Sequence, residues 1–290
     1  MKKKIKYLCF GFGQVAKYFI KNLTKSKKKF NFVATSTSPS KSKFFSKKKY
    51  LSLKFKNNSY DKRIINHIKE SDYILVSIPP IKGKDLVIKY FFNHIRNSKF
   101  KSLVYLSSTS VYGDHKGRWV TEKSKTEPTS IFGKNRLNAE NLWKKFQKRY
   151  SKPINVFRLS GIYSKENNIV KRIKLGTRLV VRKNNHFFSR VRVEDIASSI
   201  QKIFLFKNIK GEIFNVSDNL PASSEKVYKY AANALKIKSF KIISAKKIEN
   251  KMLKSFYRDS KKVSNKKLKK KLKFKLKYPT YKKGLSDFIN

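Results

Sequence analysis

The sequence predicts an α/β fold: a Rossmann-type doubly wound parallel sheet with a small C-terminal α+β lobe for substrate. Three observations predict it. Short β-rich runs alternate with amphipathic stretches through the first part of the chain, a glycine-rich turn joins the first run to the first helix, and the alternation becomes irregular further on. Such alternation is typical of parallel sheets with helices on both faces.

The elements follow from apolar periodicity taken in chain order. We expect strands at residues 5–10, 30–36, 51–55, 72–80, 102–108 and 154–163. We expect helices at 14–23, 61–70, 84–96 and 129–150. Later, short apolar runs at 178–182 and 240–244 stand on either side of a helix at 223–236. The lysine-dense end has an apolar side, which predicts a small packed element rather than a low-complexity tail: Val263, Leu268, Leu272, Phe274 and Leu276.

At 290 residues the chain is long enough to bury a core and to add a smaller lobe. We assign residues 1–163 to a dinucleotide-binding Rossmann domain, with 188–216 returning to it. Residues 164–187 and 217–290 then form the smaller, substrate-binding lobe.

The chain is strongly basic, with 72 Lys and Arg against 17 Asp and Glu and a formal net charge of +55. Such a balance suggests nucleic acid as a partner. Only 12 of the 72 are arginines, however, and the lysines are spread over most predicted helices and loops. Because specific nucleic-acid surfaces are usually Arg-rich and clustered, we expect non-specific polyanion binding at low salt and no specific nucleic-acid partner. A basic nucleic-acid-binding protein stays as a second alternative.

Features absent from the sequence predict the compartment of the protein and whether it binds a metal. Its single cysteine, Cys9, excludes an internal disulfide and fits a reducing compartment. No uncharged apolar run is long enough for a membrane span, and the opening "MKKKIKYLCFGFG" contains Lys6 within a short patch, so it predicts a strand rather than a signal peptide. We therefore expect a cytoplasmic protein with no membrane partner. The histidines show no metal-ligand spacing, which predicts no metal: His67, His94, His115 and His186.

A glycine-rich turn, "GFGQVA", follows the first predicted strand and opens the first helix. In a strand–turn–helix context the G-x-G-x-x-A pattern predicts dinucleotide binding. Gly11 permits the tight turn, Gly13 lets the backbone approach a pyrophosphate, and Ala16 allows close helix packing. Gln14 and Val15 begin the helix, whose N–H groups and dipole favour phosphate. The alternative is a tight βα turn with no ligand.

The choice of cofactor is predicted by a missing carboxylate. NAD-preferring sites usually carry Asp or Glu about 20 residues after the turn, to hold the ribose 2′-OH. The first carboxylate of this chain is Asp61. Hydroxyl residues and lysines stand in that window instead: Thr35, Ser36, Thr37, Lys41 and Lys43. Since nothing there repels a 2′-phosphate, we expect NADP to be preferred, with NAD left open.

Further motifs follow in order: "LVSIPP", "YLSSTSVYGD", "FGKNRLNAE", "VFRLSGIY", "FFSRVRVEDIA" and "EIFNVSDNLPAS". Together with the glycine turn they cover nearly the whole chain. In this order they resemble the extended short-chain dehydrogenase/reductases, the relatives of nucleotide-sugar epimerases and dehydratases. The chain is most similar to an atypical subgroup described only as NAD(P)-binding or epimerase-like.

The resemblance implies an NAD(P)-dependent oxidoreductase or epimerase acting on a small alcohol, carbonyl or nucleotide-sugar, with a homodimer as the family expectation. It also implies further cofactor-binding positions: Ser77, Ile78, Pro79, Ser107, Arg136, Ser160 and Gly161.

One expected feature is missing. In the family a hydroxyl, here Ser108, polarises the substrate carbonyl or alcohol, and a Tyr-x-x-x-Lys pair begins some two dozen residues later. Phe132 lies 24 residues after Ser108, and Arg136 takes the place of the lysine. Positions four apart share a helix face, so a phenol and an ammonium there would face one spot, where the cation would lower the pKa of the phenol. Phenylalanine has no proton to exchange, and a guanidinium is too basic to relay one.

Two hypotheses therefore stay open. In the first, the protein is an enzyme whose catalytic residues are Ser108, Tyr112 and Arg136, with His115 on the same loop as another proton carrier. In the second, it is a non-catalytic sensor that binds NADP(H). Phe132 itself is either a neighbour of the nicotinamide or a core aromatic on the stripe 132, 136, 139, 143, 146 and 150.

Two charged groups complete the predictions. Three arginines bind a phosphate-bearing substrate or are plain surface charges: Arg158, Arg190 and Arg192. Asp195 stands just before an apolar-periodic run, a position typical of a helix cap.

Overall fold

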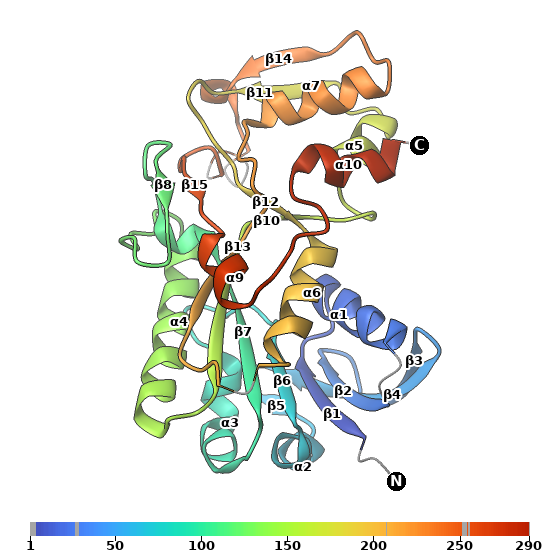
Figure 1. Cartoon of the computed structure of the whole chain (residues 1–290), viewed down its shortest axis with the longest axis vertical. Helices are drawn as coiled ribbons and strands as arrows, with labels where there is room; N and C mark the ends of the chain where they lie inside the picture. Colours follow the sequence, from blue (N-terminus) through green and yellow to red (C-terminus); the bar gives the residue numbers. More distant parts are fainter. Residues whose placement is uncertain (1–3, 27–28, 207, 251–253, 255, 290) are drawn as a thin grey trace. The chain divides into compact units, whose positions relative to one another are not determined.

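The computed structural model describes residues 4–26, 29–206, 208–250, 254 and 256–289. The chain divides into two compact units (Figure 1). The first unit comprises Met1–Ser107, Asn135–Arg158 and Ile196–Phe214, and the second comprises Ser108–Lys134, Leu159–Asp195 and Asn215–Asn290. Residues 108–134, which we assigned to the Rossmann domain, cluster with the second unit. The assignment of substrate binding to 164–187 and 217–290 stays a prediction.

One large sheet runs through the first unit. Its strands lie in the order β13 (Ile213–Val216), β9 (Ile154–Leu159), β7 (Ser102–Ser108), β6 (Tyr73–Val76), β1 (Ile5–Phe10), β2 (Phe30–Ser36), β4 (Lys48–Lys56) and β3 (Lys41–Phe45), with β5 (Ser59–Tyr60) paired to β4. Neighbours among β2, β1, β6 and β7 are parallel, as are β2 and β4, whereas β3 and β5 run antiparallel to β4. The order leads outward from β1 in both directions, the arrangement in which open α/β sheets bind ligands at their carboxyl edge.

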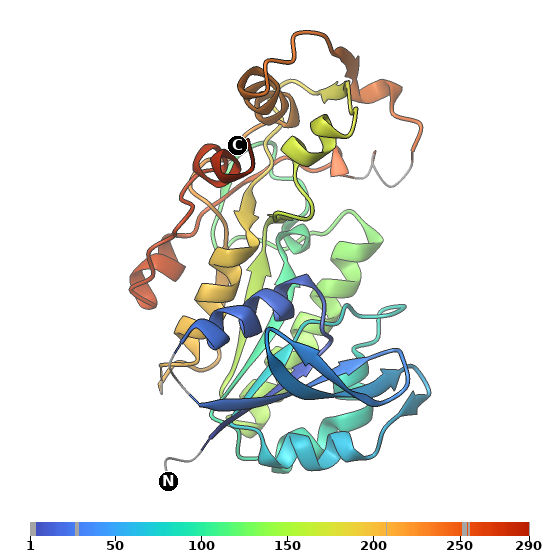
Figure 2. The same ribbon diagram turned by 90° about the vertical axis from the view of Figure 1, so that its right-hand side faces the viewer.

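Helices cover both faces of this sheet, as Figures 1 and 2 show: α1 (Gln14–Lys25), α2 (Arg63–Glu70), α3 (Leu86–Asn97), α4 (Ile131–Tyr150) and α6 (Val193–Ile203). On the face of α1 and α6, Tyr7 packs edge-on against Phe19 and also contacts Phe204. On the other face, Leu8 and Phe10 are fully buried in one cluster with residues of α2, α3 and α4. The doubly wound sheet that the alternation predicts is therefore present, because alternate strand residues are apolar toward both helix layers.

The second unit is a smaller α+β arrangement. Its strands pair in parallel as β10 (Gly161–Tyr163) with β12 (Arg190–Arg192), β11 (Leu179–Arg182) with β14 (Lys241–Ser244), and β15 (Lys262–Val263) with β8 (Trp119–Val120). Its helices are η1 (Thr109–Tyr112), α5 (Ile169–Lys174), α7 (Ser224–Ala234), η2 (Ala245–Lys247), α9 (Lys266–Lys271) and α10 (Tyr281–Ile289). Tyr163, Ile173, Tyr228 and Leu285 belong to its own buried cluster.

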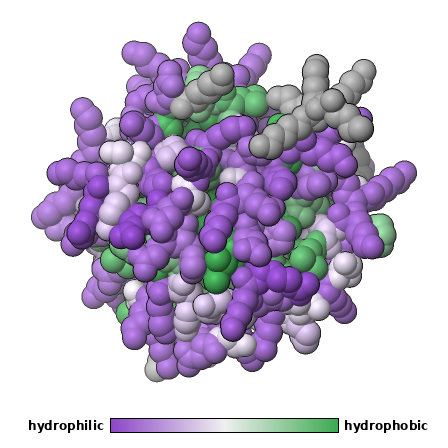
Figure 3. Space-filling view, turned by 90° about the horizontal axis from the view of Figure 1, so that it is seen from below, coloured by the Kyte–Doolittle hydropathy of each residue, from purple (hydrophilic) through white to green (hydrophobic). Residues whose placement is uncertain are grey.

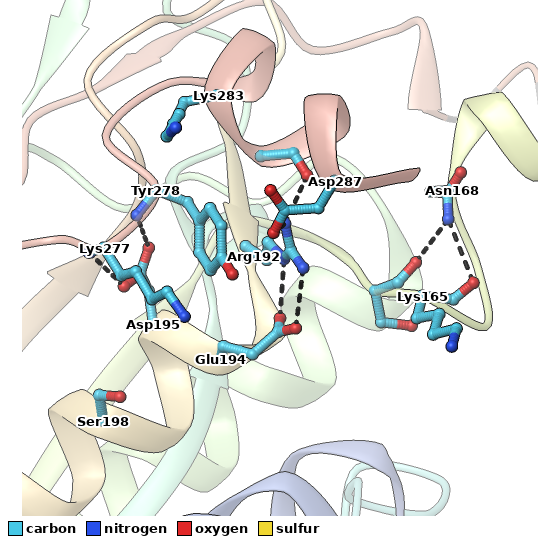
Figure 4. Close-up of polar contacts among 12 residues, drawn as sticks. Lys165, Asn168, Arg192, Glu194, Asp195, Ser198, Lys277, Tyr278, Lys283 and Asp287 are labelled. Atoms are coloured by element: carbon cyan, nitrogen blue, oxygen red, sulfur yellow. Dashed lines mark hydrogen bonds and ion pairs between the residues drawn. The ribbon is translucent and has the colours of Figure 1, made fainter. Parts of the chain in front are cut away.

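The lysine-rich end is folded, as its apolar side predicts. From Lys271 to Tyr278 exposed lysines alternate with buried apolar side chains, and Leu268 and Leu272 are fully buried. Asp195 is not a helix cap. It lies inside the first turn of α6, and its carboxylate accepts the backbone N–H groups of Lys277 (2.8 Å) and Tyr278 (2.9 Å), as Figure 4 shows.

Arg192 anchors the C-terminal helix of the second unit. Its guanidinium pairs with Glu194 and with Asp287 of α10 (Figure 4), and lies 3.7 Å from the ring centroid of Tyr278 and 4.3 Å from that of Phe288. An arginine stacked between two rings and paired with two carboxylates is bound into the structure. Arg192 is therefore neither a surface charge nor an open phosphate ligand.

Hydrophilic side chains dominate the face of the molecule shown in Figure 3, with hydrophobic residues visible between them. Within the described ranges, no helix is both long and apolar enough to span a membrane.

Candidate functional site

The glycine turn at the end of β1 is held by side chains from two neighbouring strands. The N–H of Gly11 donates to Thr35 Oγ1 at 2.9 Å, and Ser77 Oγ donates to the carbonyls of Phe10 (3.0 Å) and Gly11 (3.2 Å). Gly11 has φ +87°, and a Cβ there would lie 2.7 Å from Ile78 Cγ2. Glycine is thus required at position 11 both by conformation and by space.

Gly13 has the opposite surroundings. It is the exposed N-cap of α1, with φ −79°, and no side chain caps the helix there. Apart from its chain neighbours Phe12 and Gln14, no heavy atom of the described residues lies within 4 Å of a Cβ built on Gly13. An uncapped helix N-terminus with open space before it fits a phosphate group. Gln14 is half-buried and the side chain of Val15 is buried, so Val15 can offer only its backbone.

The hydroxyls of two predicted ribose ligands form hydrogen bonds with other groups of the protein. Thr35 is buried, and its hydroxyl already accepts the Gly11 N–H. Ser36 is half-buried, and its hydroxyl lies 3.1 Å from that of Ser52. Direct contact of Thr35 with a cofactor stays a prediction, and in the structure its hydroxyl helps to shape the turn.

Lysines gather on one face of the outer strands. Lys43 is paired in register with Tyr50, and residues 41, 43, 50, 52 and 54 share one sheet face because side chains alternate along strands. The ring of Phe12, between the two turn glycines, lies 5.0 Å from the ring of Tyr50 on that face. Lys41, Lys43 and Lys54 thus share the face of the sheet on which the glycine turn packs. Lys54 was not singled out by the sequence, since only the register of β4 brings it there.

Ser77, Ile78 and Pro79 follow β6, next to β1 in the sheet. Ser77 and Ile78 are half-buried against the turn, and Pro79 is exposed. Their predicted cofactor contacts stay predictions. The hydroxyl of Ser77 donates to two carbonyls of the turn and so stabilises the conformation of the turn.

In the second unit, Ser108 is half-buried at the end of β7, and its Oγ accepts the N–H of Ser110 at 3.1 Å, capping η1. Tyr112 is placed differently from the prediction. It is fully buried, and its phenol donates to Asn215 Oδ1 at 2.7 Å. A phenol enclosed in this way cannot exchange a proton with an open site, which argues against Tyr112 as catalytic acid. His115 stays half-buried, with Nε2 3.2 Å from the carbonyl of Lys125.

Phe132 lies in the first turn of α4 and is 63% exposed. The interpretation of Phe132 as a core aromatic is therefore wrong. The predicted stripe is buried only further along, at Ala139, Trp143 and Phe146. An exposed side chain is free to contact a bound ligand. The position of Phe132 beside a nicotinamide stays a prediction.

Gly133, beside Phe132, is a sterically constrained position that was not predicted from the sequence. A Cβ there would lie 2.7 Å from the carbonyl oxygen of Ser110 and 2.8 Å from Pro128 Cβ, so the start of α4 closely approaches the backbone of η1. A glycine inside a helical pattern is the signal that could have found it.

Arg136 extends to the strand beneath its helix. It is half-buried, and its Nη1 donates to the carbonyl of Leu106 at 2.6 Å, with Tyr105 Oη at 3.5 Å. The partner that a cation on this face requires is thus a backbone carbonyl of β7 rather than a carboxylate. Cofactor binding by Arg136 stays a prediction.

One helical turn further, α4 carries a buried ion pair. Glu140 is paired with Arg158 of β9 through both carboxylate oxygens, and it also accepts Ser107 Oγ at 3.0 Å. All three side chains are buried. Cofactor binding by Ser107 and phosphate binding by Arg158 stay predictions, and in the structure both side chains bind Glu140.

The remaining predicted residues are divided between buried and exposed positions. Arg190 donates through Nη1 to the carbonyls of Phe188 (3.0 Å) and Ala222 (2.8 Å), and its binding of a phosphate stays a prediction. Ser160 is buried, and its Oγ has no hydrogen-bond partner within the described residues. Gly161 is exposed, and its N–H donates to the carbonyl of Ser189.

No group of three or more His, Cys, Asp or Glu side chains within the described ranges could hold a metal ion. Cys9 is buried, and burial raises the pKa of its thiol to about 12, so it stays a neutral core residue.

The glycine turn, the doubly wound sheet and the Ser108 loop agree with one family. Residues 88–217 match the model of the NAD dependent epimerase/dehydratase family. The match covers a little less than half of the chain. The resemblance inferred from the ordered motifs is thereby confirmed.

Solved structures extend the likeness to the family fold over almost all of the chain. A conserved protein of unknown function from Silicibacter pomeroyi DSS is 28% identical with a TM-score of 0.85, covering 98% of this chain and 97% of that one. dTDP-glucose 4,6-dehydratase from Bacillus anthracis str. Ames, in complex with NAD, is 16% identical with a TM-score of 0.77, covering 98% and 95%. UDP-glucuronic acid 4-epimerase from Bacillus cereus, in complex with UDP-glucuronic acid and NAD, is 16% identical with a TM-score of 0.77, covering 98% and 99%. No curated protein sequence matches the chain.

Proposed function

We propose that this protein binds a nicotinamide dinucleotide at the Gly11–Gly13 turn and acts on a nucleotide-linked sugar as an oxidoreductase or epimerase. The observation that carries the proposal is the open, uncapped N-terminus of α1 at Gly13. There, backbone N–H groups and the helix dipole would hold the pyrophosphate, with Gly11 shaping the turn. The relatives solved with NAD and with UDP-glucuronic acid support the class of cofactor and of substrate.

NADP is the preferred form in this proposal. Lys41, Lys43 and Lys54 share the sheet face on which the glycine turn packs, and no carboxylate precedes Asp61 in the chain. A 2′-phosphate would gain from these cations, whereas an NAD site usually relies on an acidic residue for its ribose.

The chemistry would depend on the Ser108 loop. The bound nicotinamide would supply hydride transfer. Ser108, half-buried and held by the N–H of Ser110, would orient the reacting sugar oxygen through its hydroxyl. The proton would be carried by His115 on the same loop, since position 132 has no acidic group and the phenol of Tyr112 is enclosed.

The test is a calorimetric titration of NADPH and NADH into the wild-type protein and into Gly13→Val. Because no described atom lies near the site of a Cβ at position 13, the variant should fold as the wild type does. Its branched side chain would still occupy the space in front of the helix N-terminus. We expect tight NADPH binding by the wild type and a loss of at least about tenfold in the variant. Equal affinity of the two proteins would refute the site.

A non-catalytic sensor of NADP(H) is the second candidate. The replacement of the phenol by the exposed Phe132 favours it. The two functions differ in one respect, since only the enzyme transfers hydride between its bound nicotinamide and a sugar nucleotide. An oxidoreductase would show this as a lasting absorbance change, and an epimerase as a transient change with conversion of the sugar.

A further inference from the structure

The loop that follows Ser108 is hydrogen-bonded by a segment far away in the sequence. The N–H groups of His115 (3.1 Å) and Gly117 (2.9 Å) both donate to the carbonyl of Ser260. In return, the N–H of Ser260 donates to Asp114 Oδ1 at 2.8 Å, across 146 residues of sequence. All of these residues belong to the second unit.

Lys261 adds a charged contact to the same loop. Its Nζ donates to the carbonyl of Gly113 at 2.7 Å and lies 3.6 Å from Asp259 Oδ2, with only 12% of each of these two side chains exposed. Asp259 in turn accepts Thr129 Oγ1 at 2.6 Å. Gly113 has φ +70°, and a Cβ there would overlap the carbonyl of Glu127, so its backbone has little freedom to move. A charged donor on a buried carbonyl is among the stronger hydrogen bonds of a protein.

Ser260 is itself fixed from the other side. Its hydroxyl accepts the N–H of Phe187 at 3.1 Å and lies 3.2 Å from the carbonyl of Asn185, to which it donates. The side chain is buried. All three polar groups of Ser260 are therefore occupied, two of them by the loop after Ser108.

We propose that Lys261 and Ser260 are positioning residues for the candidate catalytic loop, residues 108–117, which they hold by its backbone from Gly113 to Gly117. The proposal rests on the function proposed above for Ser108 and His115. Neither residue takes part in the chemistry. They fix the loop on which both groups stand, because a small displacement of a catalytic group is costly in rate.

The charge of Lys261 gives this arrangement a pH dependence. Burial lowers the pKa of Lys261, whereas Asp259 and Asp114 act to raise it. His186 lies in the same surroundings, but burial lowers its pKa to about 4, so it stays neutral where the lysine titrates. Loss of the ammonium proton weakens the bond to the Gly113 carbonyl. Activity should therefore fall with rising pH before an ordinary lysine would titrate.

The experiment compares Lys261→Met and Lys261→Arg with the control Lys262→Met. Lys262 is the next residue, and its ammonium lies over the ring of Phe187 rather than on the loop backbone. The readouts are amide hydrogen exchange at His115 and Gly117, NADPH affinity, and kcat as a function of pH. We expect Lys261→Met to speed exchange at both amides and to lower kcat at least about tenfold, with unchanged NADPH affinity. Lys261→Arg, whose charge persists, should keep kcat near neutral pH and lose the alkaline decline.

Wild-type exchange at His115 and Gly117 in Lys261→Met would overturn the proposal, as would an alkaline decline that persists in Lys261→Arg. Ser260→Ala is a second variant. It removes the hydroxyl that binds the N–H of Phe187 and the carbonyl of Asn185, so Ser260 is held less firmly and exchange at His115 and Gly117 should speed up. If the wild-type protein turns over no sugar nucleotide, the proposed function fails on that ground. The exchange rates of His115 and Gly117 then still decide whether Lys261 positions the loop.

Discussion

At the scale of single residues, two glycines of one turn have separate tasks. Gly11 is enclosed by Ser77 and Ile78 and adopts a left-handed backbone conformation, whereas Gly13 has an ordinary conformation and open space. The first glycine therefore serves folding, and the second leaves space for the ligand that we propose.

Gly11→Ala should destabilise the protein by about 1–3 kcal/mol more than Gly176→Ala. Gly176 is a matched control: its φ of +93° carries the same backbone strain, but a Cβ there meets no other heavy atom of the described residues within 4 Å. Urea denaturation of the two variants measures the difference. Equal losses of unfolding free energy would show that Ser77 and Ile78 give way without cost.

Asp218 should make stability depend on pH. It is buried, and burial raises the pKa of its carboxyl to about 7, although the N–H of Leu220 and the nearby Arg190 favour its charged form. Between about pH 4 and pH 7 the folded state binds the proton that the unfolded state has released, so this group lowers stability as the pH rises through that window. The free energy of unfolding of Asp218→Asn, measured relative to that of the wild type, should therefore be higher at pH 8 than at pH 5. Urea denaturation at both pH values checks this, and the same difference at both would contradict it.

At the scale of elements, α4 is tied to the strands beneath it. Arg136 and Glu140, one helical turn apart, contact the consecutive residues Leu106 and Ser107 of β7, and Glu140 also pairs with Arg158 of β9. Arg136, at the position where the resemblance implies a lysine, is thus built into the packing of its helix. The bond to the Leu106 carbonyl explains how position 136 can hold a cation although position 132 has no phenol.

Glu140→Gln should cost about 3–5 kcal/mol of unfolding free energy, because it leaves Arg158 buried without its counter-charge. The matched control is Glu225→Gln, which breaks the pairs of Glu225 with Arg182 and Lys229, whose side chains are 48% and 47% exposed. That change should cost at most about 1 kcal/mol. Denaturant titrations of both variants supply the comparison. Similar losses of unfolding free energy in the two variants would show that burial does not determine how much the Glu140–Arg158 pair stabilises the protein.

Elements with strong apolar patterns could be predicted, and side-chain directions could not. The strands at 5–10, 30–36 and 102–108 have the predicted bounds. The strand β3 was missed because its hairpin turns at Ser46 and Lys47, both at positive φ, where a sequence signal would have been Asn or Gly. The register of that hairpin also brings Lys54 to the face of Lys41.

The candidate site shows the same limit. Gly11 could be assigned from the sequence because its positive φ and the close approach of Ile78 require glycine there. Gly13 was assigned from the G-x-G-x-x-A pattern, since its own backbone conformation is open to other residues. Thr35, Ser107 and Tyr112 could not, because whether a hydroxyl at the end of a strand faces a ligand or the interior depends on its neighbours in the fold. Each of these three hydroxyls has a partner inside the protein.

At the scale of the whole molecule, the net charge of +55 should govern encounters with polyanions. The lysine-rich end supplies exposed lysines at regular intervals, as along 271–278, but these are point charges without a bidentate reading geometry. We expect binding to arbitrary duplex DNA at low salt that is lost at about 0.15 M salt. Fluorescence anisotropy at increasing salt measures it. Binding that persists there, with a preference for one sequence, would instead support a nucleic-acid function.

The central claim is that a chain with phenylalanine at position 132 still performs the chemistry of its family, with Ser108 in place. The most direct measurement is the absorbance at about 340 nm of protein-bound NADP⁺ during incubation with UDP-glucuronic acid and related sugar nucleotides. For NADP⁺, hydride transfer to the nicotinamide appears as an absorbance increase. We predict an increase for the wild type with at least one substrate and none for Ser108→Ala. Tight NADPH binding with neither a lasting nor a transient absorbance change, and no conversion of any sugar nucleotide, would contradict the enzyme and leave the sensor.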